Sequence, residues 1–406
     1  MHARLLGLGL VALTLLAGCS SGLVLANPVP SDVPFPSSSP TKAPVADPQP
    51  IVFPRDDAPH QRLTEWWYDT GHLVAADGRH FGFEMVIFRA ERGDFPVSWA
   101  SHLAITDESG RRFLYDQRSE IGPQVDRSQP GLGFDLAITG QLVPGVPMPG
   151  AVPWTMQGVG GADHLVATGS SAGSDGPFGL DLTLDAGGRP AVLHEGAGYV
   201  DFGPAGGSYY YSRPRLDVRG TVTLDGEVIP VTGQAWFDHQ WGDFIAVGGG
   251  GWDWFAVNLA DGTDLTLSLV RAADGTYPLV YGTLVRPDGS VEHLGADAFD
   301  VAVADHWTSA ATGAVYPAAW HITIPAEELV VDLRPTVAAQ ELDTRATTGV
   351  VYWEGSQLVT ATRAGQPMSG NAYVELTGYH APAISHAPAI SPVSASSPAA
   401  ASSPAP

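Results

Sequence analysis

Residues 76–89, ADGRHFGFEMVIFR, join a turn signal to a strand signal and decide the fold class. The turn is Ala76-Asp77-Gly78, because Asp-Gly favours the positive φ angles of a tight hairpin. The residues that follow alternate in character, as the two faces of a strand do. One face would carry Phe83, Met85 and Ile87, and the other Glu84, Val86 and Phe88. This stretch therefore predicts one arm of a β-hairpin.

The same combination recurs along the chain. Turn signals at Asp225-Gly226, Asp261-Gly262 and Asp288-Gly289 separate short runs of β-branched and aromatic residues. No window of twelve residues keeps a clean helical period, and 48 Gly with 34 Pro would break most helices. We therefore expect an all-β fold of antiparallel strands.

The length of the strand-rich body indicates more than one domain. About 325 residues lie between Arg55 and Tyr379, which exceeds a usual single β-domain. Closure of a sheet into a barrel would remove its exposed edges. We expect two β-barrel domains packed together, at 55–230 and 231–380.

The first residues have the features of a bacterial lipoprotein leader. Arg4 precedes an apolar run, 5–16, that is too short to anchor in a bilayer and ends in LAGC at 16–19. We expect 1–18 to be a signal peptide and Cys19, the one cysteine of the chain, to carry lipid. Residues 19–54 would form a Pro/Ser-rich spacer, and 381–406 a disordered Ala/Ser/Pro tail.

The net charge and the hydropathy of the chain limit the classes of partner that it can bind. The formal net charge is −23, and removal of a leader that carries Arg4 would make it more negative. Such a surface is repelled by phosphate backbones, so we expect no nucleic-acid partner. No run after Cys19 approaches the roughly 18 apolar residues of a membrane-spanning helix. We expect a soluble body in the cell envelope, held by lipidated Cys19 at the outer face of the cytoplasmic membrane or at the outer membrane.

Several short motifs resemble catalytic or metal sites without the context those sites need. GSSAG at 169–173 has the form of a hydrolase nucleophile elbow around Ser171, but its surroundings read as a flexible loop. The glycine run 248–251 is not followed by the Lys-Ser/Thr of a phosphate-binding loop. His380 and His386 belong to a repeated HAPAIS sequence that we interpret as solvated. No spaced His or Cys motif is present, so we expect no metal and no cofactor.

Aromatic and ionisable residues are dense in two places: EWWYDTGHL at 65–73, and the stretch from WFDHQWG at 236–242 to WDWF at 252–255. In a strand the second stretch would divide into Phe237, His239 and Trp241 on one face and Trp236, Asp238 and Gln240 on the other. Indoles interleaved with polar groups suit a barrel lumen that holds an apolar ligand. The alternative is an aromatic core in which Asp238 is a structural carboxylate, paired with a cation such as Arg89.

At these segments the chain resembles the carotenoid hydratase (CrtC) and AttH family of lipocalin-like proteins, which is also similar to fungal cyclases that act on polyenes. The matching segments come in order and cover about residues 60 to 380. They continue with HLAITD at 102–107, YYYS at 209–212, YWEG at 352–355 and GNAYVELTGY at 370–379. The resemblance implies two lipocalin-like barrels, in agreement with the strand pattern.

The resemblance also implies site residues. In the hydratases a protonated side chain would donate to an alkene carbon, and water would capture the cation. On that basis the catalytic candidates are Asp238, His239 and Asp253. Aromatic ring faces stabilise cations, and the ligand-binding candidates are Trp67, Tyr68, His72, Trp241, Trp252 and Trp254.

Two functions follow from the resemblance. AttH-type members resemble accessory proteins of membrane transporters, and a lipid anchor with a long spacer fits that role. We therefore expect an envelope-anchored lipoprotein that binds a hydrophobic small molecule or lipid and serves ABC transporter components. The alternative is a cofactor-independent hydratase or isomerase, a lyase that protonates an alkene of a polyene, carotenoid or terpenoid. A secreted hydrolase has no credible triad.

Overall fold

The computed structural model describes residues 46–140, 152–244 and 249–380. The chain divides into two compact units, residues 1–49 and residues 50–406. The expected signal peptide 1–18, the lipid-carrying Cys19, the spacer up to residue 45 and the tail 381–406 lie outside the described residues. Within the described ranges, no helix is long and apolar enough to cross a membrane.

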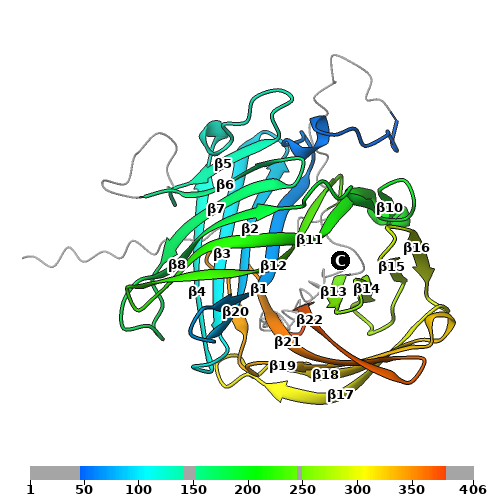
Figure 1. The fold of residues 1–406 in the computed structure, drawn as a ribbon. Helices are drawn as coiled ribbons and strands as arrows, with labels where there is room; N and C mark the ends of the chain where they lie inside the picture. The colour runs from blue at the N-terminus through cyan, green and yellow to red at the C-terminus, as the bar shows by residue number, and fades with distance from the viewer. Residues whose placement is uncertain (1–45, 141–151, 245–248, 381–406) are drawn as a thin grey trace, which may run out of the picture. The chain divides into compact units, whose positions relative to one another are not determined.

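The second unit contains two antiparallel sheets (Figure 1). The first has twelve strands, in the order β4-β3-β2-β1-β12-β11-β8-β7-β6-β5, with β9 and β10 paired to β11. The strands are β1 (Thr64–Ala75), β2 (His80–Arg92), β3 (Phe95–Asp107), β4 (Arg112–Ile121), β5 (Phe134–Ile138), β6 (Trp154–Val159), β7 (Ala162–Gly169), β8 (Phe178–Asp185), β9 (Val192–Leu193), β10 (Tyr199–Asp201), β11 (Gly207–Leu224) and β12 (Glu227–Gly242).

The second sheet has ten strands, in the order β16-β15-β14-β13-β22-β21-β19-β18-β17, with β20 paired to β21. The strands are β13 (Gly249–Leu259), β14 (Asp264–Ala272), β15 (Leu279–Val285), β16 (Val291–Gly295), β17 (Asp300–Thr308), β18 (Val315–Ile324), β19 (Leu329–Pro335), β20 (Glu341–Asp343), β21 (Val351–Arg363) and β22 (Gln366–Thr377). Short 3-10 turns are η1 (Arg55–Asp57), η2 (Pro123–Val125), η3 (Gly203–Ala205) and η4 (Pro325–Glu327). The second sheet curls on itself, as the strands around its ring in Figure 1 show.

The all-β, antiparallel prediction is confirmed. Each predicted Asp-Gly turn joins two neighbouring strands: β1 to β2, β11 to β12, β13 to β14 and β15 to β16. At the second turn Asp225 has φ 51° and Gly226 φ 85°, the pair of positive angles that a type I′ hairpin needs. Local turn chemistry thus fixes the neighbouring pairings.

The expected domain boundary at 230/231 needs correction. It falls inside β12, all of which belongs to the first sheet, and the change of sheet comes between Gly242 and Gly249. The physical reason is that β12 pairs on one side with β11, through the Asp225-Gly226 hairpin, and on the other with β1, the first strand of the sheet. The pairing of β12 with β1 joins distant parts of the chain, so the residues around position 230 give no signal for it.

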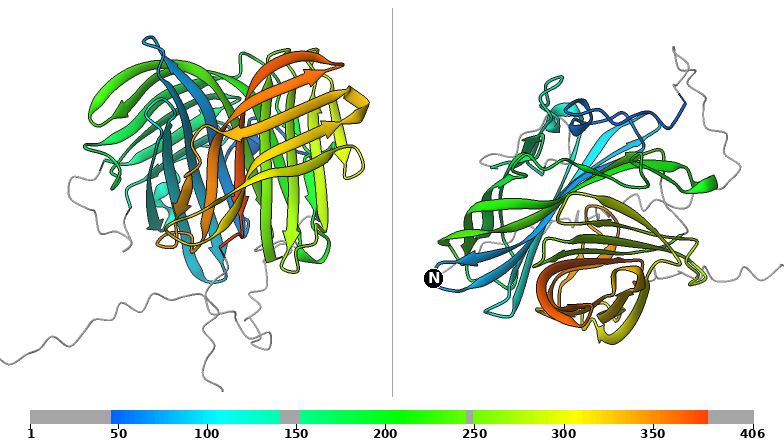
Figure 2. Two further views of the ribbon diagram at one scale, coloured as in Figure 1. Left: turned by 90° about the horizontal axis from the view of Figure 1, so that it is seen from below. Right: turned by 45° about the vertical axis from the view of Figure 1, so that its right-hand side comes forward.

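Side chains pack in three apolar layers. One lies on the inner face of the first sheet and another on the inner face of the second. The third lies between the sheets, where Tyr68 and Val86 of the first sheet meet Trp254, Ala256 and Tyr373 of the second. Figure 2 shows the strands of the first sheet passing across the second. Central strands are therefore buried on both faces.

Strand β1 illustrates this double burial. Trp67 and Leu73 face the core of the first sheet, whereas Tyr68 faces the other sheet. Gly71 is required for close packing, because a Cβ there would come within 2.5 Å of the Gln234 carbonyl oxygen and 2.6 Å of the Phe83 ring. Both faces of this strand are thus available to build buried sites.

Candidate functional site

The strand register divides the two aromatic segments between two faces of the first sheet. In the β1–β12 ladder, Trp67 lies opposite His239, and Tyr68 lies opposite Asp238. Trp67 packs in the core of the first sheet, and Tyr68 packs against the second sheet. The alternation predicted for 236–241 is present, with Phe237 and Trp241 in the core and Trp236 on the inter-sheet face. Asp238 and His239 consequently belong to different networks.

Asp238 lies at the inter-sheet face, buried to 3% exposure. Its Oδ2 accepts a hydrogen bond from the Tyr210 hydroxyl at 2.5 Å, and its Oδ1 accepts from Trp236 Nε1 at 2.7 Å and from the Ser212 hydroxyl. Burial raises the pKa of Asp238 to about 6, although these three donors act to lower it. The group can therefore exchange a proton near neutral pH.

His194 extends the Asp238 network toward the second sheet. Its Nε2 lies 2.7 Å from the Ser212 hydroxyl, and its Nδ1 lies 2.9 Å from the Thr283 hydroxyl of β15. Burial lowers the pKa of His194 to about 3, so the ring is neutral. With Ser212 donating to ionised Asp238, Nε2 must donate to Ser212 and Nδ1 must accept from Thr283. A hydrogen-bonded chain thus joins the two sheets.

Three glutamates form a second acidic group between the sheets: Glu84 on β2, Glu354 on β21 and Glu375 on β22. The Tyr68 hydroxyl donates to Glu354 Oε1 at 2.7 Å, and the Tyr352 hydroxyl donates to Glu84 Oε1 at 2.9 Å. Glu84 and Glu354 are fully buried, and in the described residues their Oε2 atoms have no hydrogen-bond partner. We call these three residues the inter-sheet glutamates.

Burial and repulsion between neighbouring carboxyl groups raise the pKa values of the inter-sheet glutamates. Burial raises the pKa of Glu84 to about 8 and that of Glu375 to about 7. The pKa of Glu354 is raised well above its usual range, first by burial and then by the charges of Glu84 and Glu375. Over the described chain, no ion pair joins any of the three to an arginine or lysine. Glu84 and Glu354 are consequently held protonated at neutral pH and can donate a proton.

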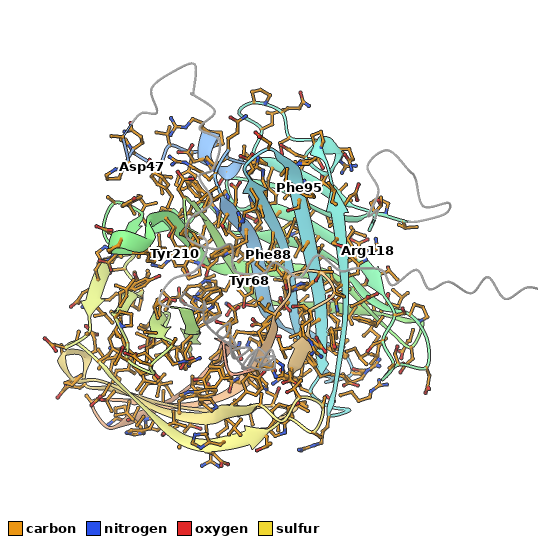
Figure 3. All side chains as sticks on the ribbon, turned by 180° about the vertical axis from the view of Figure 1, so that it is seen from behind. Asp47, Tyr68, Phe88, Phe95, Arg118 and Tyr210 are labelled. Atoms are coloured by element: carbon orange, nitrogen blue, oxygen red, sulfur yellow. The ribbon has the colours of Figure 1, made fainter. Side chains whose placement is uncertain are left out.

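Aromatic rings connect Asp238 with the glutamates. Trp254 Nε1 donates to the Tyr210 hydroxyl at 3.0 Å, and the Trp254 ring meets the edge of Tyr68 at 5.4 Å between centroids. In the β13–β22 ladder Trp254 lies directly opposite Glu375. Figure 3 shows Tyr68, Phe88 and Tyr210 in the region where the two sheets meet. The arrangement places ring faces beside proton donors.

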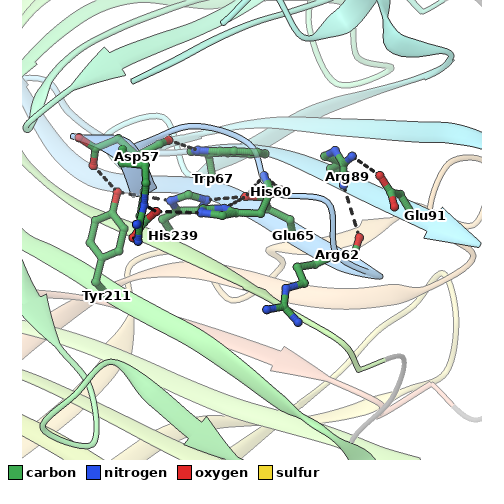
Figure 4. A network of polar contacts seen from close by, with 11 residues as sticks. Asp57, His60, Arg62, Glu65, Trp67, Arg89, Glu91, Tyr211 and His239 are labelled. Carbon is green, nitrogen blue, oxygen red and sulfur yellow. Dashed lines mark hydrogen bonds and ion pairs between the residues drawn. The ribbon is translucent and has the colours of Figure 1, made fainter. Parts of the chain in front are cut away.

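The inner face of the first sheet carries a separate network, drawn in Figure 4. His239 Nε2 lies 2.9 Å from Glu65 Oε1, and His60 Nδ1 lies 2.7 Å from the same oxygen. Burial would raise the pKa of Glu65, but the hydrogen bonds from both histidines and the charge of His60 outweigh it and lower that pKa. The Tyr211 hydroxyl donates to Asp57 Oδ1 at 2.6 Å. His239 therefore acts with Glu65 and not with Asp238.

The alternative pairing of Asp238 with Arg89 is wrong. Arg89 Nη2 donates to Glu91, and Nη1 donates to the Arg62 carbonyl at 3.4 Å (Figure 4). The reason is strand alternation, because Arg89 lies opposite Glu65 in the β1–β2 ladder, whereas Asp238 lies opposite Tyr68. Side chains alternate between the two faces of β1, so Glu65 and Tyr68, three positions apart, point to opposite faces.

Asp253 forms a third, independent site. It precedes Trp254 on β13 and contacts Arg271 Nη1 at 3.0 Å, and the Tyr379 hydroxyl donates to it at 3.0 Å. Burial raises the pKa of Asp253 to about 6, and the charge of Arg271 opposes that rise. The three predicted catalytic residues Asp238, His239 and Asp253 are thus not brought together.

The remaining ligand-binding candidates are also divided. Trp241 stacks on His60 in the inner network, with centroids 4.1 Å apart. Trp252 is 36% exposed and stacks on Trp66. His72 lies between the sheets, with Nε2 3.0 Å from the Ala372 carbonyl oxygen. Of the predicted set, Tyr68, Trp254 and Asp238 share the inter-sheet site.

An open groove of about 540 Å³ leads to the edge of the inter-sheet face. Its lining includes His72, His80, Asp217, Thr232, Gln234 and Asn371. Beyond His72 a gap of about 10 Å³ is bordered by Thr70, Trp236, Ala256 and Tyr373. This gap is far smaller than a ligand pocket, whose volume is usually about 300–1,000 Å³.

Sequence reasoning missed four residues of the inter-sheet site: Glu84, His194, Glu354 and Glu375. For two of them a signal was available in the matched segments, since Glu354 lies in YWEG and Glu375 in GNAYVELTGY. Glu84 gave no such signal, because on an alternating strand it looks like a solvent-facing residue. Long-range packing of the second sheet buries it.

The fold and this two-sided arrangement define a lipocalin-like protein with two packed sheets. The AttH-like family model matches residues 44–379, and the chain belongs to this family. An AttH protein from Nitrosomonas europaea is similar at 31% identity and a TM-score of 0.69, over 83% of this chain and 100% of that one.

A second solved structure is similar in fold alone. Kievitone hydratase from Nectria haematococca shares 17% identity with a TM-score of 0.60, over 81% of this chain and 93% of that one. The predicted resemblance to the AttH and hydratase family is confirmed. No curated protein matches the chain.

Proposed function

We propose that this protein binds an unsaturated, apolar small molecule between its two sheets and transfers a proton to it from a buried carboxyl group. It would act as a cofactor-independent lyase of the hydratase or isomerase type. The observation that carries this proposal is that Glu84 and Glu354 are fully buried near aromatic rings and are held neutral without a cation.

A site that only binds an apolar ligand has no need for such acids. A buried carboxyl group with an unpartnered oxygen costs stability, and apolar side chains of the same size would avoid that cost. Strongly shifted carboxyl pKa values in a buried site are typical of proton-transfer catalysts. The sequence pattern favoured a binder, whereas the geometry supports the alternative, a lyase.

The proposed step uses two carboxyl groups of different pKa. Protonated Glu354 gives its proton to an alkene carbon, so its O–H bond breaks and a C–H bond forms. A water molecule adds its oxygen to the neighbouring cationic carbon, and Asp238, the more acidic group, takes the released proton. Return of that proton from Asp238 to Glu354 completes the cycle. The net reaction adds one water across one double bond.

The aromatic residues have a defined part in this step. The ring faces of Trp254 and Tyr68 would stabilise the positive charge that forms on the substrate. Tyr68 also orients Glu354 through its hydroxyl, 2.7 Å from Oε1. The sequence-based hypothesis gave the donor role to Asp238, and we now assign that role to Glu354, because its pKa is raised further.

Proton transfer to a substrate is tested by incubating the protein with acyclic carotenoids and terpenoids in D₂O. We expect deuterium at a former alkene carbon in the wild type. Glu354→Gln should reduce it by about 10²–10⁴-fold, because the amide cannot donate a proton to carbon. Asp238→Asn should reduce water addition similarly.

The matched control is Glu227→Gln, which removes an exposed carboxylate paired with Arg79 and should leave deuterium incorporation unchanged. Binding of a fluorescent polyene fatty acid should stay within a few-fold of wild type in Glu354→Gln. Incorporation that survives in Glu354→Gln would contradict the proposed donor.

A binder without chemistry is the second candidate, favoured by the open groove near His72. On this proposal the protein holds a lipid or other hydrophobic molecule and passes it to transporter components. It predicts that the wild type binds the polyene fatty acid but yields no deuterated product with any acyclic polyene. Mass spectrometry of molecules that co-purify with the protein would identify the ligand class.

We also propose that Cys19 is lipidated and holds the protein at the outer face of the cytoplasmic membrane or at the outer membrane. The support is the leader sequence that ends in LAGC, together with an acidic composition that offers no basic attachment patch. Cys19→Ser should release the protein from the membrane fraction. Equal retention of the two forms would contradict this proposal.

A further inference from the structure

We infer that the inner face of the first sheet holds a divalent transition-metal site made of His60, Glu65 and His239. One ligand atom from each residue lies within 4.8 Å of the others. His60 Nδ1 and His239 Nε2 approach the same oxygen, Glu65 Oε1, at 2.7 Å and 2.9 Å. This site is separate from the proposed function, which uses the opposite face of the sheet.

The fold assembles the three ligands from distant parts of the chain. Glu65 lies on β1 and His239 on β12, and these strands pair directly. His60 lies in the segment between η1 and β1 and reaches back over the sheet. Glu65 and His239 are 174 residues apart, so no spaced metal motif appears in the sequence. The expectation of no metal rested on such motifs alone.

The carboxylate is fixed in a ligating orientation. Glu65 Oε2 accepts the backbone N–H of His60 at 2.9 Å, which leaves Oε1 facing both imidazoles. Glu65 is fully buried, so its rotamer is held by packing as well. A ligand set that is ordered before the ion arrives loses little entropy on binding it.

Indole rings hold both imidazoles. The His60 ring is parallel to Trp241 within 1°, at 4.1 Å between centroids, and the His239 ring stacks on Trp67 at 4.7 Å. Trp67 is fixed in turn, because its Nε1 donates to the Asp57 carbonyl at 3.1 Å. The two ring nitrogens that face Glu65 are therefore positioned by contacts that need no ion.

The outer ring nitrogens have the partners that metal-bound histidines use. His239 Nδ1 lies 3.3 Å from the Tyr211 hydroxyl oxygen, whose proton goes to Asp57. When a metal takes the place of the hydrogen bond from His239 Nε2 to Glu65, that oxygen accepts from Nδ1–H while the Nε2 lone pair ligates the ion. His60 Nε2 lies 3.5 Å from Asp56 Oδ1. Carboxylate–histidine pairs of this kind orient metal ligands.

The ligand set defines the class of ion. Two imidazole nitrogens and one carboxylate oxygen suit Zn²⁺ and Fe²⁺, and three protein ligands leave a position open for water. The His60 side chain is 20% exposed and offers the way in, whereas Glu65 and His239 are fully enclosed. Bound there, the ion would fasten the segment before β1 to the sheet.

The test is titration of metal-stripped, full-length protein with Zn²⁺ by calorimetry and with Co²⁺ by visible absorption. We expect a single tight site per chain, with the absorption of Co²⁺ in a site of low coordination number. His60→Gln, at the exposed edge of the site, should weaken binding by more than about 100-fold, beyond the loss of an outer-shell partner. No tight site in the wild type, or unchanged affinity in His60→Gln, would overturn the inference.

Two matched controls exclude surface binding. His164→Gln removes an exposed histidine that lies 2.8 Å from Asp181 on the same sheet, and His380→Ala with His386→Ala removes the histidines of the HAPAIS repeat. Neither should change the affinity, and loss of the site in either would refute the assignment.

X-ray absorption of the Zn²⁺-loaded wild type tests the site without a variant. It should show two imidazole ligands and no sulfur, and fewer than two imidazoles would contradict the site. This measurement decides the question if His60→Gln does not fold.

Discussion

Glu65 and Glu354 are both fully buried in this protein, yet their surroundings shift their pKa values in opposite directions. Glu65 accepts hydrogen bonds from two histidines, which lower its pKa, and is held ionised. Glu354 accepts one hydrogen bond from Tyr68 and has two further carboxyl groups nearby, so it is held protonated. Burial alone therefore does not decide the charge of a carboxyl group. The neighbours on each face of the strands decide it.

The same sheet thus separates two kinds of polar network. Its inner face carries acids paired with bases: Glu65 with His60 and His239, and Asp57 with Arg213 at 3.1 Å. Asp69 on the same face is an exception, because both its oxygens are buried without a hydrogen-bond partner in the described residues and burial raises its pKa. Its outer face, against the second sheet, collects acids and tyrosines around Asp238 and Glu354. A paired network stabilises a structure or holds a cation, whereas an unpaired acidic network can give up protons.

The largest expected difference between the two networks is in the unfolding free energy of the variants Glu65→Gln and Glu354→Gln. Glu65→Gln should destabilise the protein by roughly 3–5 kcal/mol, because it leaves half-buried His60 and fully buried His239 without their anion. Glu354→Gln should change the unfolding free energy by less than about 1 kcal/mol, because it replaces a neutral acid by a neutral amide. Urea denaturation of both variants measures the difference. Equal destabilisation would show that Glu354 is ionised in the native protein.

The pH dependence of stability sharpens the same contrast. The folded pKa of Glu84, about 8, exceeds its unfolded value of 4.5, so the native state holds the extra proton between these values. Its contribution to stability is complete below pH 4.5 and is lost as the pH rises toward 8, by roughly 1.4 kcal/mol per pH unit.

Glu84→Gln should remove this slope between about pH 5 and 8 in urea denaturation series. For Glu65 the pKa is lowered, so its contribution is present above the unfolded value and is lost as the pH falls below it. If the wild type loses no more unfolding free energy than Glu84→Gln between pH 5 and 8, the raised pKa of Glu84 is refuted.

A smaller effect on the unfolding free energy is expected for Trp254, whose ring lies between Asp238 and the inter-sheet glutamates. Trp254→Phe keeps most of the apolar surface but removes the donor to the Tyr210 hydroxyl, 3.0 Å away. We expect a loss of about 1 kcal/mol in thermal or urea unfolding. Trp236→Phe, which removes a direct donor to Asp238, should also raise the pKa of Asp238, whereas Trp254→Phe should not shift it as far. Trp236 donates directly to Asp238, whereas Trp254 acts on it only through Tyr210. A larger shift of the Asp238 pKa in Trp254→Phe than in Trp236→Phe would contradict this arrangement.

The sequence predicted the local part of this structure. Asp-Gly turns and alternating residues such as those at 83–88 gave the hairpins and the all-β class, because both depend on neighbours in the chain. The predicted domain boundary was wrong because the pairing of β12 with β1 is long-range. Such a pairing depends on the whole sheet and not on the residues around position 230.

The candidate site was predicted only in part, for a related reason. Asp238, Tyr68 and Trp254 stood out because aromatic and acidic residues cluster around them in the chain. Glu84 did not, since a single glutamate on a strand usually faces water, and here the second sheet covers it. Which acid lies beside which ring depends on packing between sheets, and strand patterns do not encode it.

Infrared spectroscopy tests most directly whether Glu84 and Glu354 are protonated at neutral pH. The carbonyl stretch of a protonated carboxyl group is distinct from the carboxylate bands and shifts in D₂O. At pH 7 the wild type should show this band, and Glu84→Gln together with Glu354→Gln should weaken it, while Glu65→Gln should leave it unchanged. A wild-type spectrum without a protonated carboxyl band at pH 7 would contradict the account.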